Sequence, residues 1–162
     1  MQYTVREKFF SITGAANTIT TADGEPAFTV TGKILSARGR MVVKDMGGAD
    51  VATVERKLIA LAPTYSINIT GGGSGVAKRK LLNNPLKPSW TITMPGQDPI
   101  TMTGNWIGRE FTFVRGGQTV ATVGRSFRTF SPGLYGVDVV DAADDLLVLC
   151  SVLVLEAHSH RR

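Results

Sequence analysis

The feature of this sequence that most constrains its fold is a turn signal that recurs every 24 residues. Glycine readily adopts the positive φ values that two-residue hairpin turns require. Regular spacing of such turns is typical of a repeat architecture, and here it predicts a series of β-hairpins. The turn dipeptides are Asp23-Gly24, Gly47-Gly48, Gly71-Gly72, Pro95-Gly96 and Gly116-Gly117.

A short strand of alternating polarity precedes each turn. In Tyr65–Ile69 and again in Trp90–Met94, apolar residues stand at every second position, the period of a strand with one buried face. A sixth copy near the C-terminus begins 24 residues after Phe111. The predicted strands of this first kind are Asn17–Thr21, Met41–Asp45, Tyr65–Ile69, Trp90–Met94, Phe111–Arg115 and Tyr135–Val139.

A second kind of strand is expected after each of the five turns, and one more copy opens the chain. Ala52–Leu58 and Ala121–Phe127 share Ala, Thr, Val and Arg at the same offsets, and the other copies are looser. Because the matching residues stand at similar distances from each turn, they indicate a repeat rather than a chance similarity. The predicted strands of this kind are Val5–Phe9, Val30–Ile34, Ala52–Leu58, Ala77–Leu81, Met102–Trp106 and Ala121–Phe127.

The first and last strands of the repeat indicate whether the sheet is open or closed. The first strand has no hairpin partner before it, and the last has none after it. Unpaired edges invite aggregation, and pairing the first strand with the last removes both of them. The sequence therefore predicts a twelve-stranded closed antiparallel β-barrel, with strands over about residues 2–139 and one domain over residues 1–162.

A barrel of this width needs a filling, because about eight strands are the most that their own side chains fill. The residues expected to point inward are apolar, so the filling should be dry. The one unassigned apolar segment is Leu146–Leu155 near the C-terminus. The inward candidates are Phe28, Val30, Ile67, Ile69, Ile92, Met94, Phe111 and Phe113.

The C-terminal segment is predicted to form a central helix over about residues 142–158. Asp141–Asp145 offers a helix cap and an acidic first turn, and Leu146–Leu155 is apolar on every face. A membrane-inserting tail is an alternative, although the run of about ten apolar residues is half of what a span needs. A β-strand is a further alternative, because Val and Leu also alternate here.

The N-terminal sequence, the cysteine content and the charge bear on the cellular compartment and on possible partners. The first eight residues lack an apolar core, so we expect no secretory signal and a cytoplasmic protein, with peripheral membrane contact left open. The single cysteine, Cys150, lies in an apolar run and should be a buried, reduced thiol. The formal net charge of +5 permits contact with an anionic surface such as phospholipid.

No group of residues predicts catalysis, a cofactor or a metal site, and we expect a non-enzymatic binding or structural module. His158 and His160 lie near the end of the chain and are expected to form a frayed polar tail. Gly71–Gly75 lacks the Lys-Ser/Thr of a phosphate loop and is interpreted as a turn. No specific nucleic acid partner is expected.

One polar pattern suggests a site. Basic residues recur near the ends of the second strands, which in a barrel lie along one rim. They predict a collar that contacts an anionic head group or phosphate, and the alternative is that they only provide solubility and edge charge. The candidate anionic-ligand residues are Arg56, Lys57, Lys78, Arg79, Lys80 and Arg125.

Three features in this order resemble the LURP-one-related family, in particular its bacterial branch. They are Lys8-Phe9-Phe10-Ser11, the recurring glycine hairpins, and Tyr135–Val139 before an acidic turn and an apolar helix. The resemblance covers nearly the whole chain. It groups the chain with tubby C-terminal domains and phospholipid scramblases, and it implies a twelve-stranded barrel around a central hydrophobic helix. Tubby domains bind phosphoinositides through basic residues, and scramblases are linked to calcium-stimulated lipid movement.

Three functional hypotheses therefore stay open. The first is a tubby-like module that binds an anionic phospholipid or a protein partner through the basic rim. The second is a scramblase-like protein whose segment Leu146–Leu155 leaves the barrel and enters lipid. The third is an enzyme with an unrecognised site in the barrel mouth. The oligomeric state is not indicated by the sequence.

Overall fold

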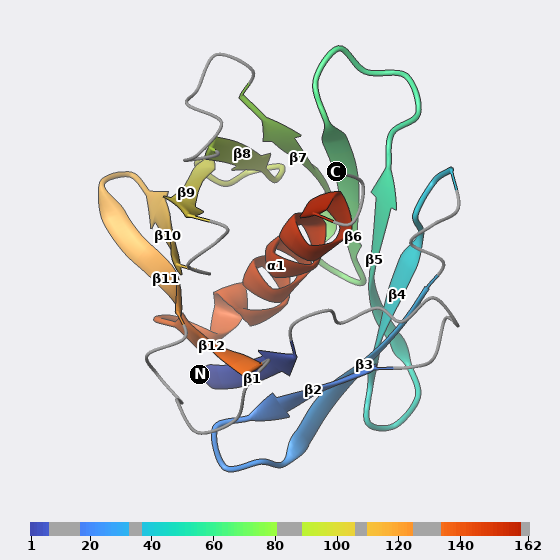
Figure 1. Cartoon of the computed structure of the whole chain (residues 1–162), viewed down its shortest axis with the longest axis vertical. Coiled ribbons are helices and arrows are strands. Elements are labelled where there is room, and N and C mark those ends of the chain that lie inside the picture. Colours follow the sequence, from blue (N-terminus) through green and yellow to red (C-terminus); the bar gives the residue numbers. More distant parts are fainter. Residues whose placement is uncertain (7–16, 33–36, 81–88, 106–109, 125–133, 160–162) are drawn as a thin grey trace.

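The computed structural model describes residues 1–6, 17–32, 37–80, 89–105, 110–124 and 134–159 (Figure 1). Twelve antiparallel strands form a closed barrel in which each strand is paired with its neighbours in the chain. The strands are β1 (Gln2–Arg6), β2 (Asn17–Thr21), β3 (Pro26–Gly32), β4 (Met41–Asp45), β5 (Asp50–Arg56), β6 (Thr64–Ile69), β7 (Gly73–Arg79), β8 (Ser89–Thr93), β9 (Ile100–Asn105), β10 (Glu110–Arg115), β11 (Gln118–Gly124) and β12 (Leu134–Val139).

The barrel is closed by its first and last strands. β1 pairs with β12 from Gln2 opposite Asp138 to Arg6 opposite Leu134, and its other edge pairs with β2. Both edges that a linear array of hairpins would expose are therefore hydrogen-bonded. The predicted fold class, strand number and closure are confirmed.

The tight hairpins all lie at one end of the barrel, because each joins the end of an even-numbered strand to the start of the next strand. At this hairpin end, Gly24 and Gly48 have φ values of 85° and 87°, which residues with a side chain rarely adopt. The longer connections, such as that from β5 to β6, lie at the opposite end, which we call the loop end.

The C-terminal segment runs through the barrel as predicted. A 3₁₀ turn, η2 (Ala142–Asp144), leads into helix α1 (Asp145–Ser159). The Asp141 carboxylate accepts a hydrogen bond from the backbone N–H of Ala143 at 3.0 Å, so it is the N-cap. From Leu147 to Ala157 every residue of α1 is buried. No helix in the described ranges is long and apolar enough to cross a bilayer.

The helix packs against the inward-facing residues of the strands in one hydrophobic core. Six of the eight predicted inward residues are buried, whereas Phe28 and Ile69 are partly buried and pack against the core. The N-terminal end of the helix is held by polar contacts. Arg115 forms a two-pronged ion pair with Asp144 at 3.0 and 3.1 Å, and the Tyr3 hydroxyl donates to Asp145 at 2.6 Å.

The strands after the turns begin earlier than the sequence predicted. β5 begins at Asp50 rather than Ala52, and β7 begins at Gly73 rather than Ala77. The interpretation of Gly71–Gly75 as a turn is thus wrong for Gly73–Gly75, which pair with β6. Ladder hydrogen bonds come from the backbone, so polar residues and glycines next to a turn join the sheet without any strand-like side-chain pattern.

Candidate anionic-ligand site

The candidate basic residues of β5 and β7 lie together at the loop end of the barrel. Only β6 separates the two strands. The Lys57 N–H donates to the Thr64 carbonyl at 2.9 Å, and Thr64 stands opposite Lys78 in the β6–β7 ladder. Because neighbouring strands are about 4.8 Å apart, the backbones of Lys57 and Lys78 are roughly 10 Å apart. We call Arg56, Lys57, Lys78, Arg79 and Lys80 the basic rim.

The pleat of β7 divides these side chains between two faces. Ala77 is buried, Lys78 and Lys80 are exposed, and Arg79 between them is half-buried. In β5, Arg56 continues the inward series of Ala52 and Val54 and is also half-buried, whereas Lys57 is exposed. Within the described part of the chain, Lys57, Lys78 and Lys80 form no ion pair. These three lysines are the cations that the rim presents to solvent.

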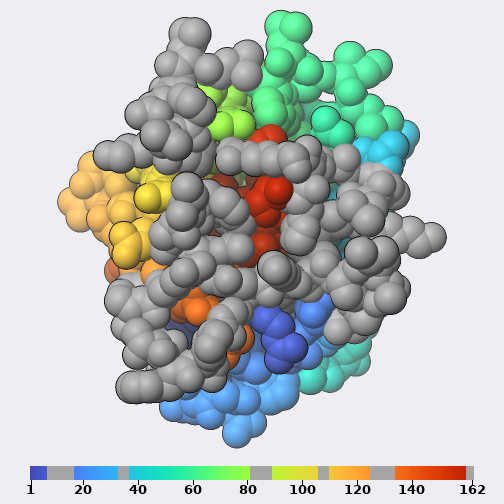
Figure 2. All heavy atoms as spheres, in the orientation of Figure 1, coloured from blue at the N-terminus to red at the C-terminus, as the bar shows by residue number. Residues whose placement is uncertain are grey.

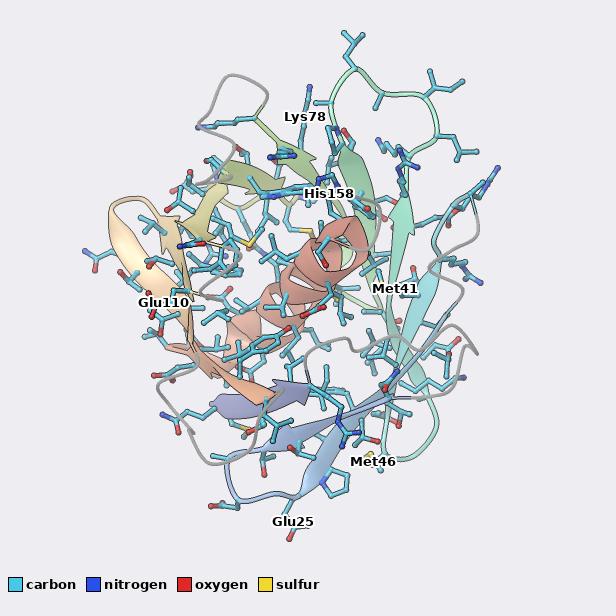
Figure 3. All side chains as sticks on the ribbon, in the orientation of Figure 1. Glu25, Met41, Met46, Lys78, Glu110 and His158 are labelled. Carbon is cyan, nitrogen blue, oxygen red and sulfur yellow. The ribbon has the colours of Figure 1, made fainter. Side chains whose placement is uncertain are left out.

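Arg79 is directed into the mouth of the barrel, where it meets the end of α1. Its Nη1 atom lies 3.2 Å from Nε2 of His158, and Figure 3 shows His158 in the upper part of the view, below Lys78. The His158 ring packs edge-on against Trp90, with centroids 5.3 Å apart and an interplanar angle of 78°. A cation at this position is favoured by the negative C-terminal end of the helix dipole.

The expectation that His158 belongs to a frayed tail is therefore wrong. The helix continues to Ser159, and the histidine is partly buried against the Trp90 ring. Trp90 also packs against Tyr65, at 6.0 Å between ring centroids. Two residues earlier in the helix, the buried Glu156 accepts a hydrogen bond from the Tyr135 hydroxyl at 2.7 Å. His160 and Arg125 lie outside the described residues.

An open groove of about 450 Å³ adjoins the rim on the outer side of β5. Arg38 and Arg40 approach it from the connection before β4, and both contact Glu55, at 3.1 and 3.9 Å. Sequence reasoning did not identify these two arginines, because they precede a strand rather than ending one. The groove is lined by Arg38, Glu55, Arg56, Lys57, Leu58, Ile59 and Ser66.

Sequence reasoning also misplaced Leu58, which was expected to be the last residue of the strand Ala52–Leu58. β5 ends at Arg56, and the Leu58 side chain is 54% exposed. The signal was present in the sequence, since the apolar run of residues 58–62 is continuous and does not alternate. A run without alternation does not have the pattern of a half-buried strand.

The described residues contain no group of three or more His, Cys, Asp or Glu side chains that could hold a metal ion. The thiol of Cys150 is enclosed by the core, and burial raises its pKa to about 12. A thiol with so high a pKa is a poor nucleophile at neutral pH. The polar chemistry that the loop end offers is therefore cationic.

Comparison with known proteins agrees with this architecture. The crystal structure of an Arabidopsis thaliana protein superimposes with a TM-score of 0.65 over 99% of this chain and 91% of that one, at 14% sequence identity. This likeness supports the fold alone. No curated protein matches the sequence. The family model of the LURP-one-related proteins matches residues 1–156, and the chain therefore belongs to the LURP-one-related family.

Proposed function

We propose that this protein is a non-enzymatic module that binds anionic phospholipid surfaces through its basic rim. The observation that carries the proposal is the cluster of Lys57, Lys78 and Lys80, which are exposed and not ion-paired in the described part of the chain. A lysine ammonium held near an anionic membrane contributes about 1 kcal/mol of attraction at moderate salt.

Two further features support a surface-binding role. The ammonium of lysine is a compact, mobile charge that suits a fluid layer of head groups better than a fixed pocket. The groove beside the rim is open, and the polar interior of the mouth is occupied by the Arg79–His158 contact and the packed Trp90 ring. A small-molecule site is normally a concave pocket that buries most of its ligand.

The scramblase-like alternative requires α1 to leave the barrel. The contacts at both ends of the helix oppose that movement, because Tyr3 donates to Asp145 and Tyr135 donates to Glu156. Expelling the helix would also expose the inward faces of the strands to water. Burial of this apolar surface favours the helix inside the barrel.

Flotation with vesicles tests the proposal. Wild-type protein should float with vesicles of phosphatidylcholine and phosphatidylserine at low salt, and it should stay at the bottom with phosphatidylcholine alone. The variant Lys78→Glu/Lys80→Glu should lose at least about tenfold in affinity, since each reversal replaces an attraction by a repulsion of similar size.

A matched control separates the rim from overall charge. The variant Lys44→Glu/Gln97→Glu/Gln118→Glu lowers the net charge by the same amount, but all three residues lie near the hairpin end. It should bind nearly as well as wild type. Equal losses in both variants, or no flotation of the wild type, would overturn the proposal.

A further inference from the structure

The connection from β5 to β6 carries the largest exposed aliphatic side chains in the described part of the chain. Ile59 is 97% exposed, Leu61 is 99% exposed, and Leu58 is 54% exposed. In Figures 1 and 2 this connection projects beyond the barrel at the top of the molecule. We call Leu58, Ile59 and Leu61 the apolar tip. The other large exposed apolar residues, Met1, Met46 and Val140, lie apart from it.

The residues that flank the apolar tip are held by hydrogen bonds and burial, and we call them its base. The backbone N–H of Lys57 donates to the Thr64 carbonyl at 2.9 Å, and the Thr64 hydroxyl donates to the Ala62 carbonyl at 2.8 Å. Ala62 and Thr64 are themselves buried. The base is thus packed into the barrel end, while Ile59 and Leu61 above it are almost fully exposed and Leu58 is partly exposed. Exposed apolar surface grouped in this way usually marks an interaction site.

Several cations lie near the tip. Lys57 precedes it in the chain, Lys78 stands opposite Thr64 of β6, Arg38 lines the adjoining groove, and Arg40 contacts Glu55 of that lining. Glu55 is the acidic residue in that lining, and both arginines contact it. A protruding aliphatic tip near several cations has the chemistry of a segment that enters the interface of an anionic bilayer.

A bilayer fits this surface better than a protein partner does. Protein interfaces are enriched in aromatic residues at their centres and depleted in lysine, and their anchors fill pockets. The tip has aliphatic side chains only, it is convex, and the exposed cations nearest to it are lysines. Acyl chains and glycerol groups accept such side chains without a preformed pocket.

We propose that Leu58, Ile59 and Leu61 insert into the interfacial layer of an anionic bilayer while Lys57, Lys78 and Lys80 contact its head groups. This inference rests on the proposed function and adds a mode of contact to it. Lysines alone give binding that salt abolishes, whereas inserted aliphatic side chains keep part of the affinity when salt is raised.

The first experiment places a polarity-sensitive fluorophore at the tip through Ile59→Cys. Met46→Cys is the matched control, because Met46 is 56% exposed and lies in the hairpin between β4 and β5, at the other end of the barrel (Figure 3). The native Cys150 is fully buried and should not be labelled. The vesicles contain phosphatidylcholine and phosphatidylserine, with or without nitroxide-labelled acyl chains.

The label at position 59 should shift to shorter wavelength on binding and be quenched by the nitroxide lipids, while the label at position 46 should do neither. Flotation of the same samples separates the two proposals. If the protein floats but neither label responds, the tip does not insert and the proposed function stands. If the wild type does not float, both proposals fail.

A second variant tests the energetics without a label. Ile59→Ser/Leu61→Ser should weaken binding at least about tenfold and make it fully salt-sensitive, because two aliphatic side chains no longer leave water. Its thermal stability should match wild type, since neither side chain packs against the protein. Unchanged affinity and unchanged salt dependence in this variant would overturn the insertion.

Discussion

At the scale of single residues, close packing explains why particular side chains are required. Gly75 in β7 lies beside β8, and a Cβ atom there would be 2.1 Å from the Met94 sulfur and 2.3 Å from the Thr93 carbonyl oxygen. A separation below 3 Å forces the backbone or the core to move. Gly75 at the start of β7 is therefore required by the packing of the sheet.

The substitution Gly75→Ala should lower the free energy of unfolding by about 1–3 kcal/mol, the usual cost of overpacking. Urea denaturation monitored by fluorescence measures this loss. Gly47→Ala is the control, because its Cβ atom would meet only the Asp45 carboxylate at 3.4 Å. A loss in the control as large as that at Gly75 would contradict the packing argument.

Cys150 gives a prediction about alkaline pH. Burial raises the pKa of its thiol from 9.0 to about 12, so between these pH values the unfolded chain releases a proton that the folded chain keeps. The contribution of Cys150 is therefore fully present below pH 9 and is lost as pH rises toward 12. Above pH 9 the stability of wild type should fall more steeply than that of Cys150→Ala, by about 1.4 kcal/mol per pH unit.

Urea midpoints at a series of pH values from neutral to pH 10.5 measure this difference in slope. If stability falls equally steeply with pH in the two proteins, folding does not raise the pKa of the Cys150 thiol.

Burial, the hydrogen bond to Asp145 and the charge of Asp145 also raise the pKa of Tyr3. This effect adds to the loss of stability at high pH in both proteins.

At the scale of elements, much of the fold could be predicted from the sequence because two signals coincide. The strands before the turns recur at a fixed distance from the turn glycines, and β2 and β4 were predicted to the residue. The central helix was predicted from an apolar run too short to span a membrane. The starts of β5 and β7 were not predicted, because Asp50 and Gly73 pair in the backbone ladder without a strand-like side-chain pattern.

The basic rim was partly predictable for the same reason. Strands that repeat in one phase end at the same side of a barrel, which places Arg56 and Arg79 at one end. Their inward direction depends on the pleat, and the contact of Arg79 with His158 depends on where α1 ends inside the barrel. The pleat follows from the two-residue period of the strand, whereas the position of the end of α1 is not encoded in local periodicity.

The helix α1 should contribute to stability according to how deeply each residue is buried. Leu149 is 1% exposed at the centre of the barrel, whereas Leu146 is half-buried in the first turn. Leu149→Ala should cost about 2–5 kcal/mol in free energy of unfolding, and Leu146→Ala should cost less than half as much. Thermal and urea denaturation measure both. Equal costs would contradict the central position of the helix.

Removal of the helix tests its role as the barrel filling. A chain that ends at Asp141 should show no cooperative thermal transition, because the inward faces of the strands would line an empty, apolar lumen. A chain that ends at Ser159 keeps all of α1 and should unfold like the full-length protein. Cooperative unfolding of the shorter chain would show that the barrel does not need the helix.

At the scale of the whole molecule, the polar contacts that hold the start of the helix and the surface proposed to bind lipid lie at opposite ends of the barrel. The N-terminal end of α1 is bonded to the barrel wall through Arg115 and Tyr3, near the hairpin end. The opposite end carries the basic rim, the groove and the apolar tip. Exposed lysines and the largest exposed aliphatic side chains of the described residues thus lie at one end, and the proposed membrane contact would turn this end toward the bilayer.

Hydrogen–deuterium exchange on a timescale of seconds, with and without anionic vesicles, tests this orientation most directly. The account predicts slower exchange on binding for the backbone amides of residues 57–62 and 78–80. The hairpin turns at residues 46–49 and 95–97 and the helix α1 should exchange as they do in free protein. Protection at the hairpin turns, or faster exchange throughout α1, would contradict the account.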